Sequence, residues 1–156
     1  MDTNGHENGI SLIIPEHIAR LWDSRSGDIL KLGHPTLRTV ARPVGRPTPS
    51  TRKLVERMKI ALREENGLGL AAPQVGVDER VIIYRLPEEN APLRIIIDPR
   101  ITSAKGEQTA EEGCLSLPYL HGEVTRAREI IVKGTDMLGR SFRRRASDLE
   151  ARVIQH

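Results

Sequence analysis

The chain has 156 residues and a formal charge of +3, from 24 Lys and Arg against 21 Asp and Glu, so we expect a single domain and learn little about partners from charge. The only cysteine, Cys114, excludes an intramolecular disulfide and favours a reducing compartment. No long apolar run opens the sequence, which argues against a signal peptide or a membrane anchor and makes the cytoplasm the expected location.

The N-terminal part of the chain predicts two helices on either side of a proline-rich loop. Residues 1–27 read as a polar extension, in which Pro15 can open a short helix. Prolines spaced through 28–47 exclude regular structure there. Thr48 or Ser50 then caps a second helix, whose apolar residues recur at helical spacing. They are Leu54, Val55, Met58, Ala61 and Leu62.

Short runs of β-branched residues bounded by prolines predict strands in the second half of the chain. The clearest are 81–84 and 93–97, which follow a glycine-rich loop at 67–76. Residues 123–146 read as a further series of strands, with a hairpin turn at Leu138-Gly139. Because helices do not alternate with single strands, we predict an α+β fold, with antiparallel strands packed around a C-terminal helix and the N-terminal helix on the outside.

The end of the chain predicts that C-terminal helix. Ser147 and Glu150 stand at the spacing of a capping box, which indicates where the helix begins. Leu149, Val153 and His156 fall at i, i+4 and i+7 and therefore share one face, which we expect to point inward. A histidine held inward by a rigid helix can bind a metal ion.

Three segments carry residues suited to chemistry, and the first is 67–74 (GLGLAAPQ). Its two glycines allow the backbone to approach another backbone or a ligand closely. The side-chain amide of Gln74 can donate hydrogen bonds to a developing oxyanion. The alternative is a helix cap that runs into a tightly packed turn, and these residues alone favour that alternative.

The second segment is 111–118 (EEGCLSLP), in which Cys114 follows two acidic residues. Nearby carboxylates are expected to raise the pKa of the thiol, which argues against a nucleophile of lowered pKa. A bound divalent cation would change this, because it holds the thiolate outright. An inert buried thiol is the alternative for a lone cysteine. We also expect Glu112 to be partly buried and paired with Arg126.

The third segment is Gln155-His156. In zinc hydrolases a His-Glu-x-x-His motif places two ligands one helical turn apart with a glutamate base between them. This sequence contains only the first histidine. Taken alone, a histidine at this position reads as a frayed surface residue.

In their order along the chain, the three segments resemble the peptide deformylase family. The spacing between Gln74, Cys114 and His156 also fits that family, and residues 28–30 and 37–44 are similar to its opening. The resemblance therefore runs from residue 28 to residue 156. It implies a metal-dependent hydrolase that removes the N-formyl group from the initiator methionine of newly made proteins.

The resemblance also implies roles for individual residues. The family binds one divalent metal ion, with Fe²⁺ expected here and Zn²⁺ or Ni²⁺ as substitutes. The implied ligands are Cys114, His156 and a further histidine, with water in the fourth position. Gln74 and the backbone N–H of Leu115 are implied as donors to the oxyanion. The residues expected to line a groove for an extended N-formylmethionyl peptide are Leu68, Gly69 and Gly113.

The family's third motif continues past its first histidine with a glutamate and a second histidine, whereas this sequence ends at His156. We therefore expect the catalytic domain over 28–156 to be incomplete at its C-terminus. Reading the coding sequence beyond the codon for His156 tests this expectation. The alternative is a catalytically inactive deformylase-like protein. That alternative predicts no formate release from formyl-Met-Ala-Ser, even with added metal.

A weaker alternative is a small nucleic-acid-binding domain that uses Arg140 and Arg143–Arg145. The arginine run lacks interleaved aromatic residues and reads better as a solvated edge, so no contact with DNA is expected. Transient contact with the ribosome stays open, because the implied substrates emerge there. No tail suited to ribosome docking is present in the sequence, and no membrane contact is expected.

Overall fold

The computed structural model describes residues 13–23 and 27–156, so most of the predicted polar extension at 1–27 lies outside the described residues. Within the described part the helices are α1 (Glu16–Asp23), α2 (Pro49–Glu64) and α3 (Asp148–Gln155), with short 3₁₀ turns η1 (Pro35–Arg38) and η2 (Ala72–Val75). The strands are β1 (Gly69–Ala71), β2 (Val81–Tyr84), β3 (Arg94–Lys105), β4 (Gln108–Cys114), β5 (Leu117–Arg126), β6 (Glu129–Thr135) and β7 (Ser141–Ser147).

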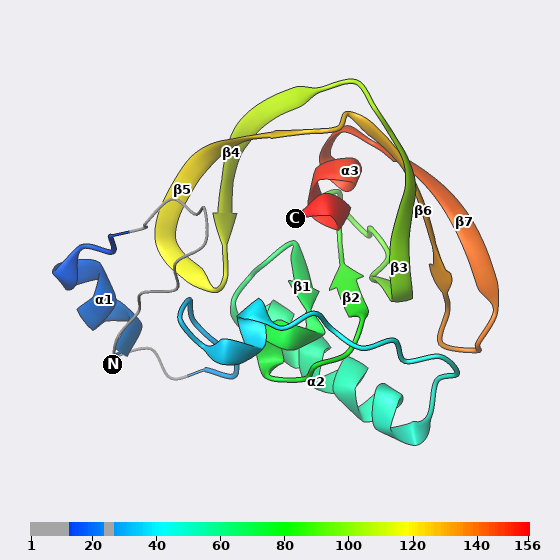
Figure 1. The fold of residues 1–156 in the computed structure, drawn as a ribbon, viewed down its shortest axis with the longest axis horizontal. Helices are drawn as coiled ribbons and strands as arrows, with labels where there is room; N and C mark the ends of the chain where they lie inside the picture. Colours follow the sequence, from blue (N-terminus) through cyan, green and yellow to red (C-terminus); the bar gives the residue numbers. More distant parts are fainter. Residues whose placement is uncertain (1–12, 24–26) are drawn as a thin grey trace.

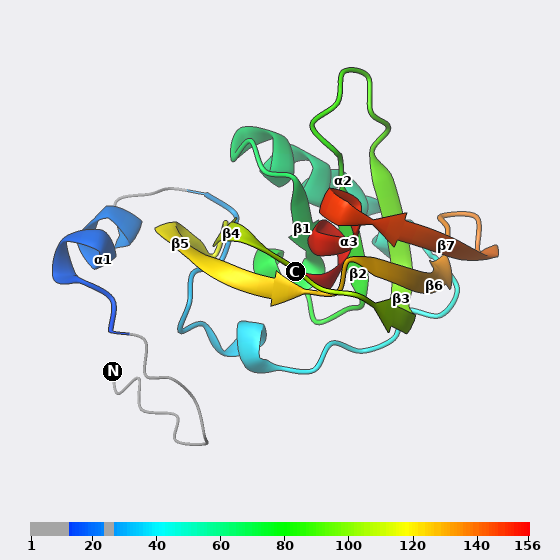
Figure 2. The same cartoon turned by 90° about the horizontal axis from the view of Figure 1, so that it is seen from above.

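The strands form two antiparallel sheets. One has five strands in the order β1-β2-β3-β6-β7, and the other is the β4-β5 pair. The β4-β5 ribbon arches over α3, which lies between this ribbon and the larger sheet, while α2 covers the opposite side (Figure 1). The view in Figure 2 places α1 outside the body of the fold, beyond β5. The predicted α+β fold is confirmed, and no described helix is long and apolar enough to cross a membrane.

Helix α2 forms as its sequence predicts and builds the main core. The hydroxyl of Thr48 accepts a hydrogen bond from Thr51 N, while Thr48 N donates to Thr51 Oγ1, so the two threonines cap the first turn reciprocally. The whole predicted apolar stripe is buried. It packs against residues of β1, β2 and β3, which include Leu70, Val81, Ile83 and Ile97.

Helix α1 docks on the ribbon through one aromatic side chain. Trp22 is buried, and its indole N–H donates to Pro118 O over 2.8 Å. Pro118 lies at the start of β5 and follows the segment that contains Cys114. The amphipathic helix predicted after Pro15 therefore exists, and it supports the ribbon from outside.

Two details of α3 differ from the sequence prediction. Ser147 makes no side-chain capping bond, and Asp148, the first residue of the helix, adopts φ +50°. The predicted inward face is also wrong in part, since Leu149 is 39% exposed and the His156 side chain is 38% exposed. The residues that α3 buries are Ala151 and Arg152, because the helix is turned toward the β4-β5 ribbon as well as toward the sheet.

The two helix starts make a testable contrast. We expect Thr48→Ala to lower the free energy of unfolding by about 1 kcal/mol, because a capping bond is lost. We expect Ser147→Ala to change it by less than about 0.5 kcal/mol, as for an exposed residue without a specific contact. Urea denaturation of both variants measures the difference. Equal losses would contradict the capping geometry described for α3.

Glu150 forms a different set of contacts from the predicted capping box. Its carboxylate accepts hydrogen bonds from Tyr84 Oη (2.8 Å) and from Arg144 Nε and Nη2 (2.8 and 3.0 Å). These bonds tie α3 to β2 and β7. Burial raises the pKa of this carboxyl, but the hydrogen bonds from Arg144 and Tyr84 outweigh burial, and the net pKa lies below its ordinary value.

This lowered pKa predicts how acid acts on the fold. The ionised Glu150 carboxylate stabilises the protein fully above its unfolded pKa of about 4.3, and that stabilisation is lost as the pH falls through the lowered folded pKa. We expect Glu150→Gln to be less stable than the wild type at pH 7 and to lose less stability on acidification below about pH 4.3. Chemical denaturation across this pH range provides the measurement, and parallel profiles for the two proteins would contradict it.

Strand β3 runs longer than its sequence predicts. It passes through Pro99 because the ladder with β6 shifts register between Ile97 and Arg100, so no amide hydrogen is needed from the proline. Asp98 adopts φ +51° at this bulge, and its carboxylate accepts hydrogen bonds from Val44 N and Gly45 N, each 2.8 Å long. The bulge therefore holds the proline-rich loop against the sheet.

Candidate metal centre

Cys114 and His156 meet from two different elements. Cys114 is the last residue of β4, and His156 directly follows α3. The two side chains interact, since His156 lowers the pKa of the Cys114 thiol and Cys114 raises the pKa of the imidazole. Gln74 approaches from η2, with its Nε2 atom 3.9 Å from the sulfur of Cys114. The three residues that carry the three sequence motifs therefore converge at one point.

The amide of Gln74 is held in one orientation. Its Oε1 atom accepts a hydrogen bond from Ala71 N (2.9 Å), and its Nε2 atom donates to Ser116 Oγ (3.1 Å). Ser116 is buried, and its carbonyl oxygen accepts from Leu32 N over 2.9 Å. The acceptor end of the amide is thus occupied by the backbone, and the donor end points toward Cys114.

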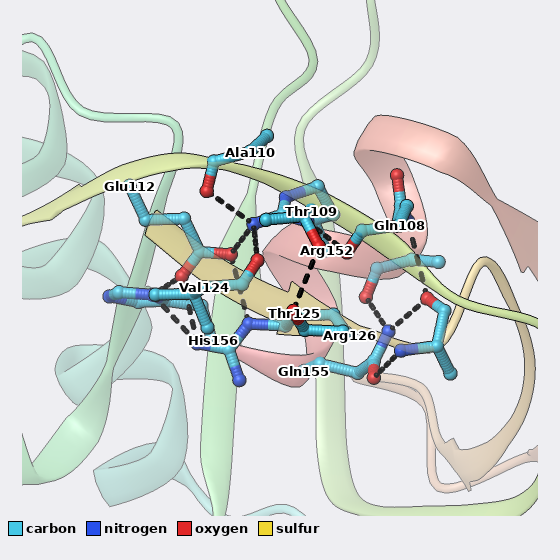
Figure 3. A network of polar contacts seen from close by, with 12 residues as sticks. Gln108, Thr109, Ala110, Glu112, Val124, Thr125, Arg126, Arg152, Gln155 and His156 are labelled. Atoms are coloured by element: carbon cyan, nitrogen blue, oxygen red, sulfur yellow. Dashed lines mark hydrogen bonds and ion pairs between the residues drawn. The ribbon is translucent and has the colours of Figure 1, made fainter. Parts of the chain in front are cut away.

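Glu112 links His156 to two arginines (Figure 3). Its Oε2 atom lies 2.8 Å from His156 Nδ1, and Arg126 donates to both carboxylate oxygens over 2.9 and 2.8 Å. The predicted pair of Glu112 and Arg126 is confirmed. The bonds from Arg126 and His156 outweigh burial and lower the pKa of this carboxyl to about 2. Glu112 is therefore ionised at neutral pH, and it accepts a hydrogen bond from the imidazole.

The expected effect of the acidic neighbours on Cys114 is wrong. Burial raises the pKa of the thiol, but hydrogen bonds with His156 and with the backbone of Ser116 and Leu117 lower it, and the net pKa lies below its ordinary value. The carboxylate of Glu112 does not oppose this, because Arg126 neutralises it. The thiol lies in surroundings that favour the thiolate, which is the form that binds metal ions.

The residues expected to line a groove belong to β1, to the position just before it, and to β4. Leu68 is 39% exposed and directly precedes β1, an edge strand that pairs only with β2 among the described strands. A Cβ atom on Gly69 would lie 3.0 Å from Val153 of α3, and one on Gly113 would lie 2.9 Å from the His121 ring. These two glycines therefore permit close packing, whatever else they do. The side chain of Leu115 is half-buried against the main core.

Sequence reasoning missed two residues of this region, Ser116 and Arg152. Ser116 stands two residues after the cysteine, and nothing in its local sequence indicates that its hydroxyl meets Gln74. Arg152 stands four residues before His156, so both lie on the same face of one helix. The spacing of four residues from His156 could have indicated that Arg152 lies near the site. An arginine in a helix is, however, normally taken as part of a solvated face.

Thiol and imidazole groups are the ligands that zinc and iron-group divalent cations accept in proteins. The Nδ1 atom of His156 is tied to a carboxylate, which leaves Nε2 for a metal ion, as in most metal-binding histidines. Cys114 and His156 thus fit two ligand positions of a divalent cation. Residues 13–23 and 27–156 contain no group of three or more His, Cys, Asp or Glu side chains that could hold a metal ion.

Comparison with known proteins decides the family. The model of the polypeptide deformylase family matches residues 27–156. This chain belongs to the polypeptide deformylase family. Peptide deformylases of Carboxydothermus hydrogenoformans and Neisseria gonorrhoeae are similar, with 40% identity over 128 residues and 41% over 129. The first alignment covers 82% of each chain, and the second covers 83% of this chain and 77% of the relative.

Solved structures of peptide deformylases share the fold. A Legionella pneumophila enzyme superposes with a TM-score of 0.78 at 36% identity, over 82% of this chain and 76% of that chain. An Acinetobacter baumannii enzyme with Met-Ala-Ser bound superposes with a TM-score of 0.77 at 31% identity, over 85% of this chain and 92% of that chain. Polypeptide deformylases are metal-dependent, which agrees with the pairing of Cys114 and His156.

Proposed function

We propose that this chain is a metal-dependent hydrolase that removes the N-formyl group from the initiator methionine of newly made proteins, and that residues 28–156 carry the activity. The observation that carries the proposal is the convergence of Cys114, His156 and the Gln74 amide at one point. A member of the polypeptide deformylase family with this arrangement has two metal ligands and an oriented hydrogen-bond donor, which are part of what metal-assisted amide hydrolysis needs.

We assign Cys114 and His156 as ligands of one divalent ion. Fe²⁺ is the proposed ion, and Zn²⁺ or Ni²⁺ can take the same ligands. When bound, the ion supplies Lewis-acid activation of water and of the formyl oxygen. The chain itself supplies the Cys114 thiol, whose pKa lies below its ordinary value, and the ionised Glu112, which keeps the proton of His156 on Nδ1.

Gln74 and Leu115 are the proposed donors to the oxyanion. The amide of Gln74 needs no reorientation for this, because Ala71 N already occupies its oxygen and Ser116 already holds its nitrogen near Cys114. Donors fixed before the reaction stabilise developing charge without a cost of reorganisation at that moment. The backbone N–H of Leu115 directly follows Cys114 and is proposed as the second donor.

The proposed substrate is an N-formylmethionyl peptide bound in extended form. Strand β1 offers an edge for one further strand, and Leu68, Gly69 and Gly113 are the proposed lining of that groove. Peptides bound in this way gain main-chain hydrogen bonds that do not depend on sequence, which suits an enzyme that acts on many proteins. The relative with Met-Ala-Ser bound supports the same peptide class here.

Formate release from formyl-Met-Ala-Ser tests the proposal. The chain is incubated with Fe²⁺, Ni²⁺ or Zn²⁺ under anaerobic conditions, and formate is measured with and without a chelator. We expect release that the chelator abolishes. Metal binding at one equivalent without any formate release would instead establish the inactive deformylase-like protein.

We further propose that the chain works in the cytoplasm, where it meets nascent chains at the ribosome. The arginine run carries less free charge than its sequence suggests, since Arg144 pairs with Glu150 and Arg145 pairs with Glu129. Arg143, however, is exposed and stands in one cross-strand row with two other exposed cations, Arg100 and Lys133. Cosedimentation with ribosomes tests this proposal. If the protein does not cosediment even at low salt, this row is excluded as an RNA contact.

A further inference from the structure

Arg152 is a buried arginine inside the region described above. Only 7% of its side-chain surface is exposed. Its guanidinium donates to Gln108 O (3.0 Å), Ala110 O (3.1 Å), Val124 O (2.8 Å) and the Oε1 atom of Glu112 (2.6 Å). Figure 3 shows these acceptors around the guanidinium, three on β4 and one on β5.

The two proposed metal ligands come from elements that are joined mainly by such side-chain bonds. Cys114 belongs to the β4-β5 ribbon, which is a separate sheet, whereas His156 follows α3. Ala110 and Val124 are direct partners across the ribbon, so the guanidinium of Arg152 bonds to β4 and β5 at paired residues. Gln155 also bonds to Ala127, which directly follows β5. Only Arg152 among the α3 residues before His156 also holds the carboxylate that contacts His156.

We propose that Arg152 is a positioning residue that fixes the β4-β5 ribbon against α3 and thereby sets His156 opposite Cys114. It does so in two ways at once. Its bonds to main-chain carbonyls set how far β4 lies from the helix, and its bond to Glu112 fixes the carboxylate that orients the His156 ring. The inference rests on the proposed metal centre, but it can be tested without turnover.

The chemistry of the side chain explains why an arginine suits this position. A planar guanidinium can donate several hydrogen bonds in fixed directions, and here it meets four acceptors. Nη1 donates to Gln108 O, while Nη2 shares its two hydrogens among the other three acceptors. A lysine ammonium is a single nitrogen on a flexible stem and cannot occupy both positions. Stability alone does not call for an arginine, since buried ion pairs can often be replaced by apolar residues without loss. The arrangement is therefore better explained by what it positions.

Arg144 offers a matched control. It also forms a two-pronged pair with a carboxylate that ties α3 to a strand, through Glu150, over 2.8 and 3.0 Å. It makes no contact with Cys114, Glu112 or His156 among the bonds described. Loss of Arg144 therefore weakens the attachment of α3 without disturbing the chain of contacts from Arg152 to His156.

The experiment compares Arg152→Met, Arg152→Lys and Arg144→Met with the wild type in the full chain. The measurements are the melting temperature, the Zn²⁺ affinity by competition with a chelator, and the ¹⁵N spectrum of the His156 imidazole in metal-free protein. We expect Arg152→Met to weaken Zn²⁺ binding about 10- to 100-fold, as loss of a partner that orients a ligand does. We also expect the Nδ1–H signal of His156 to lose its hydrogen-bonded character.

Arg144→Met is expected to lower the melting temperature while Zn²⁺ affinity stays within about threefold of the wild type, as expected for a site it does not contact. Arg152→Lys is expected to keep the fold and to recover only part of the affinity. Equal losses of affinity in the two methionine variants would overturn the proposal. Wild-type Zn²⁺ affinity in Arg152→Lys would also overturn it. This second comparison tests the proposal even if Arg152→Met does not fold. If the wild type binds Zn²⁺ normally but releases no formate, that result counts against the proposed function and not against the positioning role of Arg152.

Discussion

Replacing Cys114 by serine is expected to remove the bound metal ion and, with it, hydrolysis of formyl peptides. Serine has nearly the same shape as cysteine, but its hydroxyl is not a thiolate at neutral pH and is a poor ligand for iron-group cations. Loss of a residue that merely orients a ligand costs about 10- to 100-fold, so loss of a ligand itself should lower kcat/KM by more than about 100-fold. Metal content by mass spectrometry and formate release give the two measurements.

The structure supplies the control for this prediction. The polar groups that lower the pKa of the thiol, which are His156 and the backbone of Ser116 and Leu117, suit a hydroxyl as well. We therefore expect the metal-free Cys114→Ser protein to melt close to the metal-free wild type. An inert buried thiol, the alternative for a lone cysteine, predicts instead that metal content and activity survive the change.

Local sequence patterns predicted the elements whose determinants lie within a few residues. Helix α2 formed where Thr48 could cap it and where apolar residues recur at helical spacing. Strand β2 and the hairpin of β6 and β7 also formed at β-branched runs and at the turn containing Gly139, which adopts φ +79°. In each case propensity, pattern and turn chemistry agreed, which is the condition under which sequence reasoning succeeds.

The sequence was least informative for the ribbon that carries Cys114. Strand β4 reads QTAEEGC, which lacks the apolar alternation of a strand packed on a core. It forms because it pairs with β5 and because Arg152 holds its carbonyl oxygens, and both partners are distant in sequence. The same distance explains why motif reasoning identified Gln74, Cys114 and His156 but left Arg152 out.

The expected capping box shows a different limit. Ser147 and Glu150 have the right spacing, but Glu150 instead accepts hydrogen bonds from Tyr84 and Arg144. Those bonds involve a phenol and a guanidinium inside a half-buried region, where they stabilise more than an exposed capping bond does. Tertiary contacts therefore overrode a local preference at the point where α3 has to meet both the sheet and the ribbon.

The second large effect is expected at Gln74. Gln74→Leu should lower kcat about 10²- to 10³-fold with little change in KM, because it removes a donor that acts on charge present only in the transition state. The metal content should stay at the wild-type level, since Gln74 is not among the proposed ligands. Steady-state kinetics with formyl-Met-Ala-Ser, on protein of measured metal content, checks both statements.

Leucine also removes the acceptor of the Ala71 amide hydrogen, so part of its effect could come from a disturbed turn. Gln74→Glu separates the two contributions. Glutamate keeps the length of the side chain and an oxygen that can accept from Ala71 N, but it replaces the donating nitrogen beside Ser116 and Cys114 by a second oxygen. If the donating nitrogen of Gln74 serves the reaction, both variants have a lowered kcat. Only the leucine variant then also loses about 1 kcal/mol or more of the free energy of unfolding, which is the typical cost of leaving a partly buried amide hydrogen unpaired. A glutamate variant with wild-type kcat would show that Gln74 serves the turn and not the reaction.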